Sequence, residues 1–278
     1  MKKVLITGAA KRLGKDLAIH LGKQDFFVWV HYNNSKKEAE DVLKLINSSG
    51  GTGELIQGDI SQYSQARSIA EHIRSNGGAL NVLINNVGKY STGEITQFSV
   101  ENFESIINTN LLGSYYMIQE LHPLFNQEGG NIINIGYTGI NSLAASKQAT
   151  AYSISKTGLY ILNTSYAEAL AEKNIRVNMI SPGHLQNSID LPKDIKAVEL
   201  GSNQEVKIGD TVYAIGHPKS LPWSFSFGMV NQKRRNHKWT YEDKSEHEAT
   251  VIQMQTPIST GSSGGPLFSG VGKVVGVN

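Results

Sequence analysis

The stretch VLITGAAKRLG, residues 4–14, is the clearest indication of fold in this chain of 278 residues. Its apolar start predicts a strand over Val4–Thr7, and the spacing of apolar residues in Leu13–Lys23 predicts an amphipathic helix. A turn between a strand and a helix leaves free backbone N–H groups at the positive end of the helix dipole, where a pyrophosphate can bind. Gly8 would allow the tight turn, and Gly14 the close packing of the helix on the sheet. By itself, such a turn is equally typical of an ordinary loop.

The alternation of apolar strand and amphipathic helix continues to about residue 195. Further strands are predicted over Phe27–His31, Glu54–Ile56, Val82–Ile84, Ile132–Ile135 and Val177–Ile180. Helices are predicted over Ser35–Asn47, Glu101–Leu121 and Ala151–Glu172. Nearly continuous apolar strands that alternate with helices indicate a parallel sheet covered on both faces, and right-handed crossovers make it doubly wound. We therefore expect an α/β domain with a doubly wound parallel sheet.

The pattern changes after Ile195. Short apolar runs separated by Gly, Pro and polar residues predict antiparallel strands over residues 206–216, 224–230, 250–254 and 274–277. The polar tract Gln232–His247 is predicted to be an exposed loop. We therefore expect two domains, residues 1–195 and 196–278, the second built of antiparallel β structure.

The composition excludes several classes of protein. With 39% hydrophobic and 18% charged residues, the chain has enough apolar surface to offset the entropy lost on folding, so disorder is not its dominant state. A net charge of +2 is too small to favour nucleic acid or an anionic membrane as the main partner. Without cysteine there is no disulfide, thiolate metal site or cysteine nucleophile, and no metal site is predicted. The absence of cysteine suits a cytoplasmic protein, and since no apolar run reaches about 18 residues we expect no membrane span.

The end of the second predicted strand indicates which dinucleotide would bind. NAD sites commonly place Asp or Glu there to hold the ribose hydroxyls. In this chain the strand ends in His31, Tyr32, Asn33, Asn34 and Ser35. No acidic residue follows before Glu38, and Lys11 and Arg12 add positive charge in the preceding turn, which favours a 2′-phosphate. These residues predict NADP(H), although the same composition is also found in solvated turns.

Tyr152 and Lys156 are four residues apart, so both would lie on one face of the helix predicted over Ala151–Glu172. A free tyrosine has a pKa of about 10 and exchanges protons poorly at neutral pH. A neighbouring ammonium favours the phenolate and lowers that pKa, which makes Tyr152 a usable acid–base group. A Tyr/Lys pair at this spacing is also common on helix surfaces, so the pair alone does not establish catalysis.

Six motifs follow one another in a definite order. They are the turn at residues 7–14, Gly58-Asp59-Ile60, Asn85-Asn86-Val87-Gly88, Asn110-Leu111-Leu112-Gly113, the Tyr152/Lys156 pair and Ser181-Pro182-Gly183. In this order and spacing they resemble the short-chain dehydrogenase/reductase family over about residues 1–195. The resemblance implies an oxidoreductase that transfers a hydride between NADP(H) and a small carbonyl or alcohol substrate.

The resemblance also implies a role for each matching residue. Tyr152 would protonate the carbonyl oxygen, Lys156 would bind the nicotinamide ribose, and Asn110 would hold a water that relays protons to Lys156. Asp59 would contact the adenine. The full set of implied cofactor-binding residues is Gly8, Lys11, Arg12, Leu13, Gly14, His31, Tyr32, Asn33, Asn34, Ser35, Asp59, Ile60, Asn86, Gly88, Tyr152, Lys156, Pro182 and Gly183. The family further implies a homodimer formed through the helices predicted at Glu101–Leu121 and Ala151–Glu172.

The chain departs from the family pattern at two positions. Arg12 replaces the middle glycine of the first turn, a variant that looks like the pteridine-reductase branch and fits NADPH. Tyr137 occupies the place of the serine that polarises the substrate. Either Tyr137 or Thr138 would then supply the hydroxyl, or Tyr137 would only pack. After residue 192 the family's lid helix and seventh strand are replaced by unrelated sequence.

Residues 260–267, TGSSGGPL, form the second informative motif. With GDTVYAIGHP at 209–218 before it, the motif resembles the second β-barrel of a trypsin-like protease of the Deg type, over about residues 197–278. The resemblance implies a partial antiparallel β-barrel with Ser263 as the nucleophile. A serine needs a base and an orienting acid, which the family carries on its first barrel. His217, His237 and His247 do not match that base, so we expect no proteolysis. Serine hydrolysis through Ser263 and non-catalytic NADP(H) binding are the alternative functions.

Overall fold

The computed structural model describes residues 1–76, 78–138, 140, 146, 148–183, 185, 198–216, 224–240, 246–255 and 266–277. The chain folds into two compact units, Met1–Asn187 and Ser188–Asn278. The domain boundary predicted between residues 195 and 196 lies outside the described residues.

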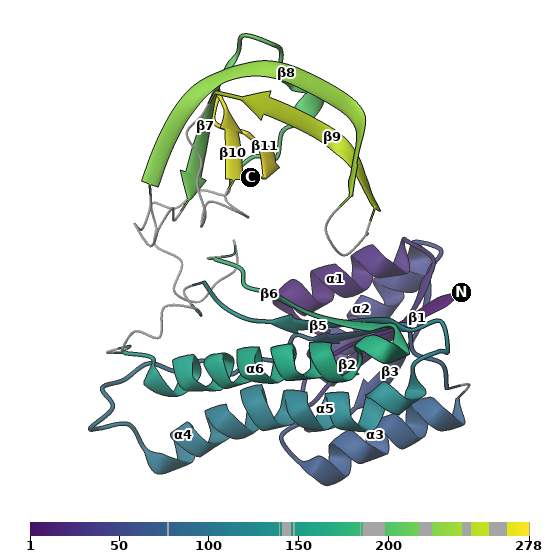
Figure 1. The fold of residues 1–278 in the computed structure, drawn as a ribbon. Coiled ribbons are helices and arrows are strands. Elements are labelled where there is room, and N and C mark those ends of the chain that lie inside the picture. Colours follow the sequence, from purple (N-terminus) through teal and green to yellow (C-terminus); the bar gives the residue numbers. More distant parts are fainter. Residues whose placement is uncertain are drawn as a thin grey trace. The chain divides into compact units, whose positions relative to one another are not determined.

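Unit 1 is built around a parallel sheet of six strands (Figure 1). The strands are β1 (Lys2–Ile6), β2 (Phe26–Tyr32), β3 (Thr52–Gln57), β4 (Val82–Asn85), β5 (Gly130–Ile135) and β6 (Ile175–Ile180). Their spatial order is β3-β2-β1-β4-β5-β6, so the direction of winding reverses between β1 and β4. This order confirms the doubly wound sheet, and it places the carboxyl ends of all six strands at one edge.

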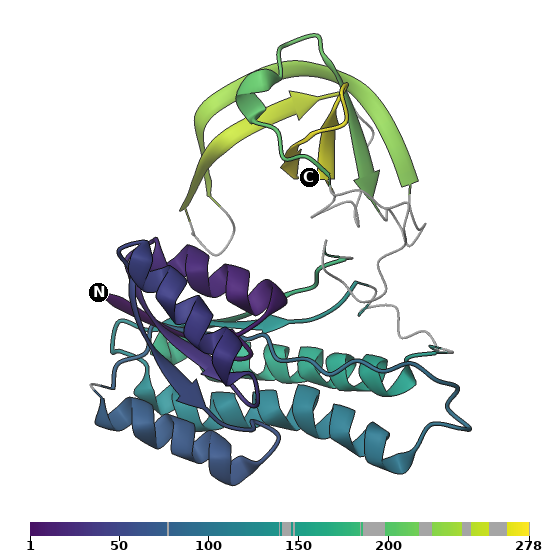
Figure 2. The same ribbon diagram turned by 180° about the vertical axis from the view of Figure 1, so that it is seen from behind.

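Helices cover the sheet in two layers. On one face lie α1 (Arg12–Gly22) and α2 (Lys36–Ser48) (Figures 1 and 2). The other face carries α3 (Tyr63–Ser75), α4 (Val100–Ile107), α5 (Gly113–Leu121) and α6 (Thr150–Ala169). This two-sided cover is the physical reason that the strands are apolar nearly throughout.

The helix predicted over Glu101–Leu121 is interrupted. α4 and α5 are joined by a π-helical turn at Asn108–Leu112, so the two helices are continuous but not one regular α-helix. Hydrophobic spacing does not detect a π-turn, because one extra residue per turn leaves the apolar pattern on either side intact. The turn contains Asn110, one of the predicted site residues.

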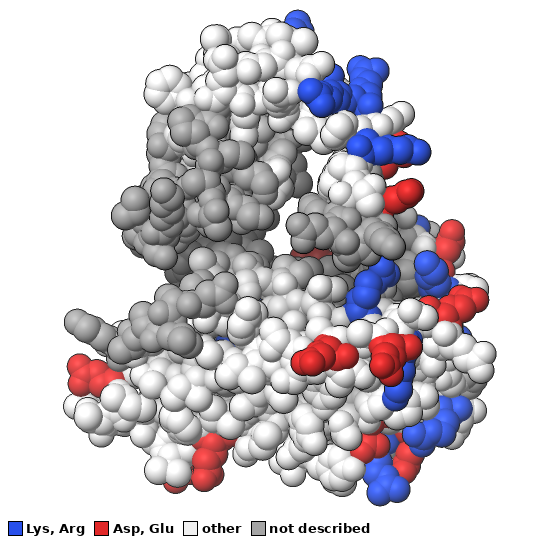
Figure 3. Space-filling view, viewed as in Figure 1, with Lys and Arg blue, Asp and Glu red and all other residues white. Residues whose placement is uncertain are grey.

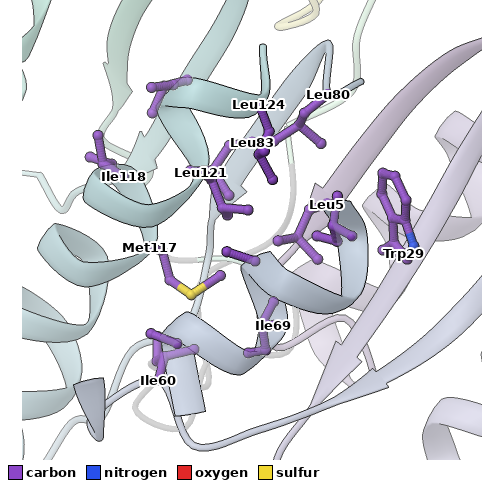
Figure 4. Close-up of a cluster of buried hydrophobic side chains, with 14 of the residues drawn as sticks. Leu5, Trp29, Ile60, Ile69, Leu80, Leu83, Met117, Ile118, Leu121 and Leu124 are labelled. Carbon is purple, nitrogen blue, oxygen red and sulfur yellow. The ribbon is translucent and has the colours of Figure 1, made fainter. Parts of the chain in front are cut away.

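The core of unit 1 consists of apolar side chains on both faces of the sheet. In one cluster, Leu5 and Leu83 of the central strands meet Met117 and Leu121 of α5, with Trp29 beside them (Figure 4). A second cluster fills the α1–α2 face and includes Ile6, Val30 and Val42. Full burial of one such side chain contributes about 1.5–3 kcal/mol. The cluster on the α5 side also anchors the loops that carry the candidate site.

Unit 2 is a curled antiparallel sheet. Its strands are β7 (Thr211–Gly216), β8 (Ser224–Thr240), β9 (Glu246–Met254), β10 (Pro266–Ser269) and β11 (Val274–Val277), in the order β11-β10-β7-β8-β9. Val212 and Ala214 of β7 pack against Val230, Leu267 and Val275. The sheet forms a half-barrel (Figure 1), which confirms the predicted partial antiparallel β-barrel.

The loop predicted over Gln232–His247 is wrong for residues 232–240 and 246–247, which are strand, while residues 241–245 lie outside the described residues. Strand β8 continues through Thr240 and pairs with β9, where Lys238 lies opposite Glu248. The physical reason is cross-strand pairing: the ladder satisfies the backbone, and Lys238 Nζ lies 3.4 Å from Glu248 Oε2. Polar composition predicted a loop because the two faces of this hairpin carry polar side chains.

Charges of both signs are mixed on the surface of unit 1 in the view of Figure 3. Basic side chains gather on the β8–β9 side of unit 2 in the same view. None of the described helices has the length and apolar character that a membrane span requires. Within the described ranges, no cluster of His, Asp and Glu side chains is arranged for a metal ion.

Candidate functional site

The turn between β1 and α1 has the geometry of a phosphate-binding loop. Gly8 has a positive φ of +66°, a conformation that favours glycine. A Cβ at Gly14 would lie 2.3 Å from the carbonyl oxygen of Gly8, so only glycine fits there. Arg12 also has a positive φ, +51°, at the position where the family commonly has glycine. The turn therefore keeps a left-handed backbone at residue 12 although that residue is Arg and not Gly.

His31 connects this turn to its neighbours. Its Nδ1 accepts a hydrogen bond from the backbone N–H of Gly8 at 3.0 Å, and its Nε2 lies 3.0 Å from the carbonyl oxygen of Gly58. The ring is 1% exposed, and burial lowers the pKa of His31 to about 4. The structure thus places this predicted cofactor residue in the interior, with both ring nitrogens bonded within the protein.

Two more predicted cofactor residues are buried. Tyr32 belongs to the core cluster on the α1–α2 face, and Ile60 to the cluster around α5. Their side chains alternate into the interior because β2 and the β3–α3 turn are covered on both faces.

The exposed positions around this end of the sheet carry the polar groups. Asn33 and Asn34 are exposed, and Ser35 immediately precedes α2. Lys11 forms an ion pair with Glu38 of α2, with Nζ 2.8 Å from Oε1. The Lys11 hydrogen bond holds the pKa of Glu38 below its usual value. Arg12 is exposed beside this pair.

Asn86 and Thr7 link the first turn to the end of β4. The Asn86 side-chain amide donates to the carbonyl oxygen of Thr7 at 2.9 Å, and its backbone N–H donates to Thr7 Oγ1 at 2.9 Å. The neighbouring Asp59 caps the β3–α3 turn by accepting from the backbone N–H and the hydroxyl of Ser61. The turns after β1 and β4 flank the point where the winding reverses, the place where doubly wound sheets bind ligands, and the Asn86–Thr7 bonds hold these two turns together.

Lys156 is a buried cation at the same edge of the sheet. Its Nζ donates to the carbonyl oxygen of Ile135 at 2.6 Å and lies 5.9 Å from the centre of the Tyr152 ring. Desolvation lowers the pKa of Lys156 to about 8. A Cβ at Gly88 would lie 3.7 Å from Nζ, an ordinary van der Waals distance, so the loop after β4 passes next to the lysine. The Tyr/Lys pair therefore faces the strand ends.

Two tyrosines pack against the Tyr152 ring. Tyr90 packs edge-on against Tyr152 with ring centres 5.0 Å apart, and Tyr137 does so at 5.5 Å. Thr138 instead donates its hydroxyl to the carbonyl oxygen of Pro182 at 3.0 Å. Of the two hydroxyls left open by the sequence, that of Tyr137 belongs to the ring next to Tyr152. The Thr138 bond joins the turn after β5 to Pro182 and Gly183 after β6.

Asn110 is fully buried within the π-turn. Its Oδ1 accepts from the backbone N–H of Lys89 at 2.7 Å, and its amide donates to the Lys89 carbonyl oxygen at 2.9 Å. The amide also donates to Ser155 Oγ, which in turn donates to the Tyr152 carbonyl oxygen. Asn110 therefore ties the β4 loop to the helix that carries Tyr152.

The motif Asn85-Asn86-Val87-Gly88 pointed to Asn85, but sequence reasoning missed Asn134 and Asn163, which form a chain of buried asparagines with it. Asn85 donates to Asn134 at 2.9 Å, and Asn134 donates to Asn163 of α6 at 2.9 Å. This chain fixes α6 on the sheet, which sets the height of Lys156 above β5. The available signal was Asn134 within the apolar run Ile132–Ile135, since a buried amide needs a partner.

Residues 2–194 match the short chain dehydrogenase family profile. The chain belongs to the short-chain dehydrogenase family. Among curated relatives of this short-chain dehydrogenase, an uncharacterized oxidoreductase of Methylorubrum extorquens is 35% identical over 184 residues, which is 66% of this chain and 73% of the relative. A 3-oxoacyl-(acyl-carrier-protein) reductase of Staphylococcus aureus is 30% identical, over 66% of this chain and 74% of that protein.

Solved structures agree on the fold of this short-chain dehydrogenase. A metagenomic short-chain oxidoreductase in complex with NADP is 26% identical with a TM-score of 0.62, over 66% of this chain and 82% of that one. A dehydrogenase/reductase from Sinorhizobium meliloti has a TM-score of 0.63 at 24% identity, over 66% of this chain and 73% of that one. Residues 175–277 match the trypsin-like peptidase domain profile, which overlaps the first match at β6. Both resemblances drawn from the sequence are thereby confirmed.

The predicted nucleophile of the second unit, Ser263, lies outside the described residues, as does His217. His237 stacks on Trp239 along β8, with ring centres 6.0 Å apart. His247 lies in β9 opposite Trp239.

Proposed function

We propose that this short-chain dehydrogenase is an NADP(H)-dependent oxidoreductase that interconverts a carbonyl and an alcohol, with Tyr152 as the proton donor. The observation that carries the proposal is the buried Lys156 ammonium under the Tyr152 ring, at the edge of the sheet where the glycine turn opens. Family membership supports the oxidoreductase class, and the residues around the turn support the phosphorylated cofactor.

The first turn fits a dinucleotide. Lys15 is an early residue of α1 whose N–H bonds back into the turn, to the Lys11 carbonyl oxygen. The N–H groups of Arg12, Leu13 and Gly14 come before it, at the positive end of the helix dipole. Gly14 allows the start of α1 to pack against the Gly8 carbonyl group, where a Cβ would clash, and so holds these N–H groups beside the turn.

The 2′-phosphate would bind beside the start of α2. Lys11 and Arg12 provide charge, and the exposed Asn33 and Asn34 provide donors, with Ser35 at the helix start. Asp59 would meet the adenine, and Asn86, Gly88, Pro182 and Gly183 would line the nicotinamide end. The chemistry that this cofactor supplies when bound is hydride transfer to a carbonyl carbon, or the reverse.

Tyr152 would donate its proton to the substrate oxygen as negative charge develops there. The Lys156 ammonium favours the resulting phenolate, and it loses a proton more readily than an exposed lysine because burial lowers its pKa to about 8. Tyr137 would supply a second hydroxyl to the substrate oxygen in place of serine. Asn110 would complete the relay that returns protons to Lys156.

A direct test compares the wild type with Tyr152→Phe. We expect both proteins to bind NADPH with higher affinity than NADH. Binding is measured from the quenching or shift of the chain's fluorescence on titration with each nucleotide. The test substrates are 3-oxoacyl thioesters, because the Staphylococcus aureus relative is a 3-oxoacyl-(acyl-carrier-protein) reductase. Their turnover should fall by about 10²–10⁴-fold in Tyr152→Phe, because the proton donor is lost. The affinity for NADPH should be unchanged. Absence of binding of either nucleotide to the folded wild type would overturn the proposal.

Serine hydrolysis through Ser263 is the rival activity. A serine hydroxyl needs a base within hydrogen-bond reach, and His237 is stacked on Trp239. We therefore expect a fluorophosphonate probe to leave Ser263 unlabelled. Labelling of Ser263 that is lost in Ser263→Ala would show a second activity in unit 2.

A further inference from the structure

We propose that His31 is a positioning residue whose neutral imidazole clamps the Gly8 turn to the Gly58 turn, and thereby shapes the dinucleotide site without contacting the cofactor. The inference rests on the proposed function in one respect, because it assumes that this crevice binds a pyridine nucleotide. It replaces the expectation that His31 itself binds the cofactor.

The two ring contacts determine the tautomer. The backbone N–H of Gly8 is a donor, so Nδ1 of His31 must present its lone pair at 3.0 Å. The proton then lies on Nε2, which donates it to the Gly58 carbonyl oxygen at 3.0 Å. A protonated ring would carry a second N–H, which cannot accept from Gly8. Only one of the three possible states of the imidazole satisfies both partners.

The main chain around His31 repeats the connection. The N–H of Ala9 donates to the His31 carbonyl oxygen at 2.8 Å, and the N–H of Gly58 donates to the Tyr32 carbonyl oxygen at 3.0 Å. The end of β2 therefore holds the turn after β1 on one side and the turn after β3 on the other. Side-chain and main-chain hydrogen bonds together set the spacing of these two turns. In the proposed site, the turn at Gly8 would bind the phosphates and the turn at Asp59 would contact the adenine.

The surroundings keep the ring neutral. The residues next to Gly8 in the first turn, Thr7 and Ala9, are uncharged, as are Val30 and Tyr32 on the same strand. The carboxylate of Asp59, in the β3–α3 turn, acts in the opposite direction and favours protonation. Burial outweighs it, and lowers the pKa of His31 to about 4. At neutral pH the clamp is therefore closed.

The first experiment needs no cofactor. Nitrogen chemical shifts of the His31 ring in the ligand-free full chain should show the neutral Nε2–H tautomer at pH 7, with titration only well below pH 6. Exchange of the Gly8 amide hydrogen should be at least about tenfold faster in His31→Leu, because leucine offers no acceptor. A ring in the Nδ1–H form, or one that titrates as an exposed histidine does, would overturn the inference.

The second experiment measures dissociation constants for NADP⁺, which is stable in acid. We expect His31→Leu to weaken binding by about tenfold or more, and His31→Gln to stay within about threefold of wild type, since glutamine carries both an acceptor oxygen and a donor nitrogen. Val28→Ala is the matched control. Val28 is a buried residue of the same strand, lies in the core cluster on the α1–α2 face and makes no recorded contact with Gly8.

The control separates positioning from loss of stability. If Val28→Ala lowers the melting temperature as much as His31→Leu does but leaves the NADP⁺ affinity unchanged, the clamp is supported. If both variants weaken binding in proportion to their melting temperatures, the inference is wrong. If the wild type binds no nucleotide, the proposed function fails instead, and the tautomer and amide exchange still decide whether the clamp exists.

Discussion

At the scale of single residues, the site depends on side chains that are costly to bury. Lys156 is 2% exposed, and its ammonium is held by one carbonyl oxygen and the Tyr152 ring. Burial of a charge is unfavourable unless it is paired, so this lysine lowers the stability of the fold, a cost that the proposed role in proton transfer would explain. Arg12 adds a smaller cost, because its left-handed backbone is unfavourable for a residue with a Cβ.

The Lys156 pKa predicts how stability depends on pH. The folded-state pKa is about 8 and the usual value is 10.5, so between these values the unfolded chain binds more protons than the folded one. The free energy of unfolding should therefore rise with pH across this window, by about 3 kcal/mol from this residue. Urea unfolding of wild type and Lys156→Met should differ in this slope, whereas exposed Lys173→Met should follow wild type. Equal slopes in all three proteins would contradict the assigned burial.

Replacing Arg12 by glycine should separate stability from cofactor choice. Arg12→Gly relieves the strain of the left-handed backbone but gives the unfolded chain more conformational freedom. Because these two effects oppose each other, we expect the free energy of unfolding to change by no more than about 1 kcal/mol. The affinity for NADPH should fall by about tenfold, because a charge-assisted contact to the 2′-phosphate is lost, and the affinity for NADH should not. Lys15→Gln, in the same helix, is the control. An equal loss for both nucleotides would argue against a role in selecting the phosphate.

At the scale of elements, the π-turn at Asn108–Leu112 organises the side of the sheet that carries the candidate site. It turns Asn110 inward, where the carboxamide bonds both main-chain groups of Lys89 and the hydroxyl of Ser155. π-turns within helices are rare and are often found at functional sites. The turn thus couples the loop after β4 to α6.

Asn110→Leu tests this coupling. The substitution leaves the Lys89 N–H and carbonyl groups without their partners, so we expect a loss of about 1–3 kcal/mol in the free energy of unfolding. Turnover should fall by at least tenfold while NADPH affinity stays near wild type, because the cofactor floor lies on other turns. Thr109→Ala in the same π-turn serves as the control. If turnover is unchanged in Asn110→Leu, the residue is only structural.

At the scale of the whole molecule, the long helices carry apolar side chains outward. Ile154 and Ile161 of α6 are 48% and 61% exposed, and their seven-residue spacing places them on one face. Tyr115 of α5 is also exposed. We propose that a second copy covers this face, as the family resemblance implies.

Light scattering checks the assembly. We expect a mass of twice the 30.3 kDa of one chain for wild type, and one chain mass for Ile161→Asp, because a carboxylate cannot be buried unpaired at low cost. Leu45→Asp, on α2, is equally an exposed apolar-to-acid change and should remain dimeric. A monomeric wild type would reject the dimer.

Much of this architecture could be predicted from local sequence. Periodicities and spacings within short windows of sequence reveal the six apolar strands, the glycine turn, the Tyr152/Lys156 pair and the change of pattern near residue 195. Such windows are informative because each reflects the physics of one strand or helix. The family followed from six such windows in order, and the trypsin-like resemblance from the glycine-serine motif near Ser263. These features need no knowledge of distant contacts.

The tertiary structure alone decided the features that depend on residues far apart in the chain. His31 became a clamp because Gly8 and Gly58 lie on either side of β2, and Tyr137 became a neighbour of Tyr152 because the turn after β5 meets α6. Likewise, β8 extends through a polar tract because β9 supplies its hydrogen bonds and a counter-charge. Polar side chains are placed by the partners that satisfy them, and those partners are brought together only when the sheet assembles.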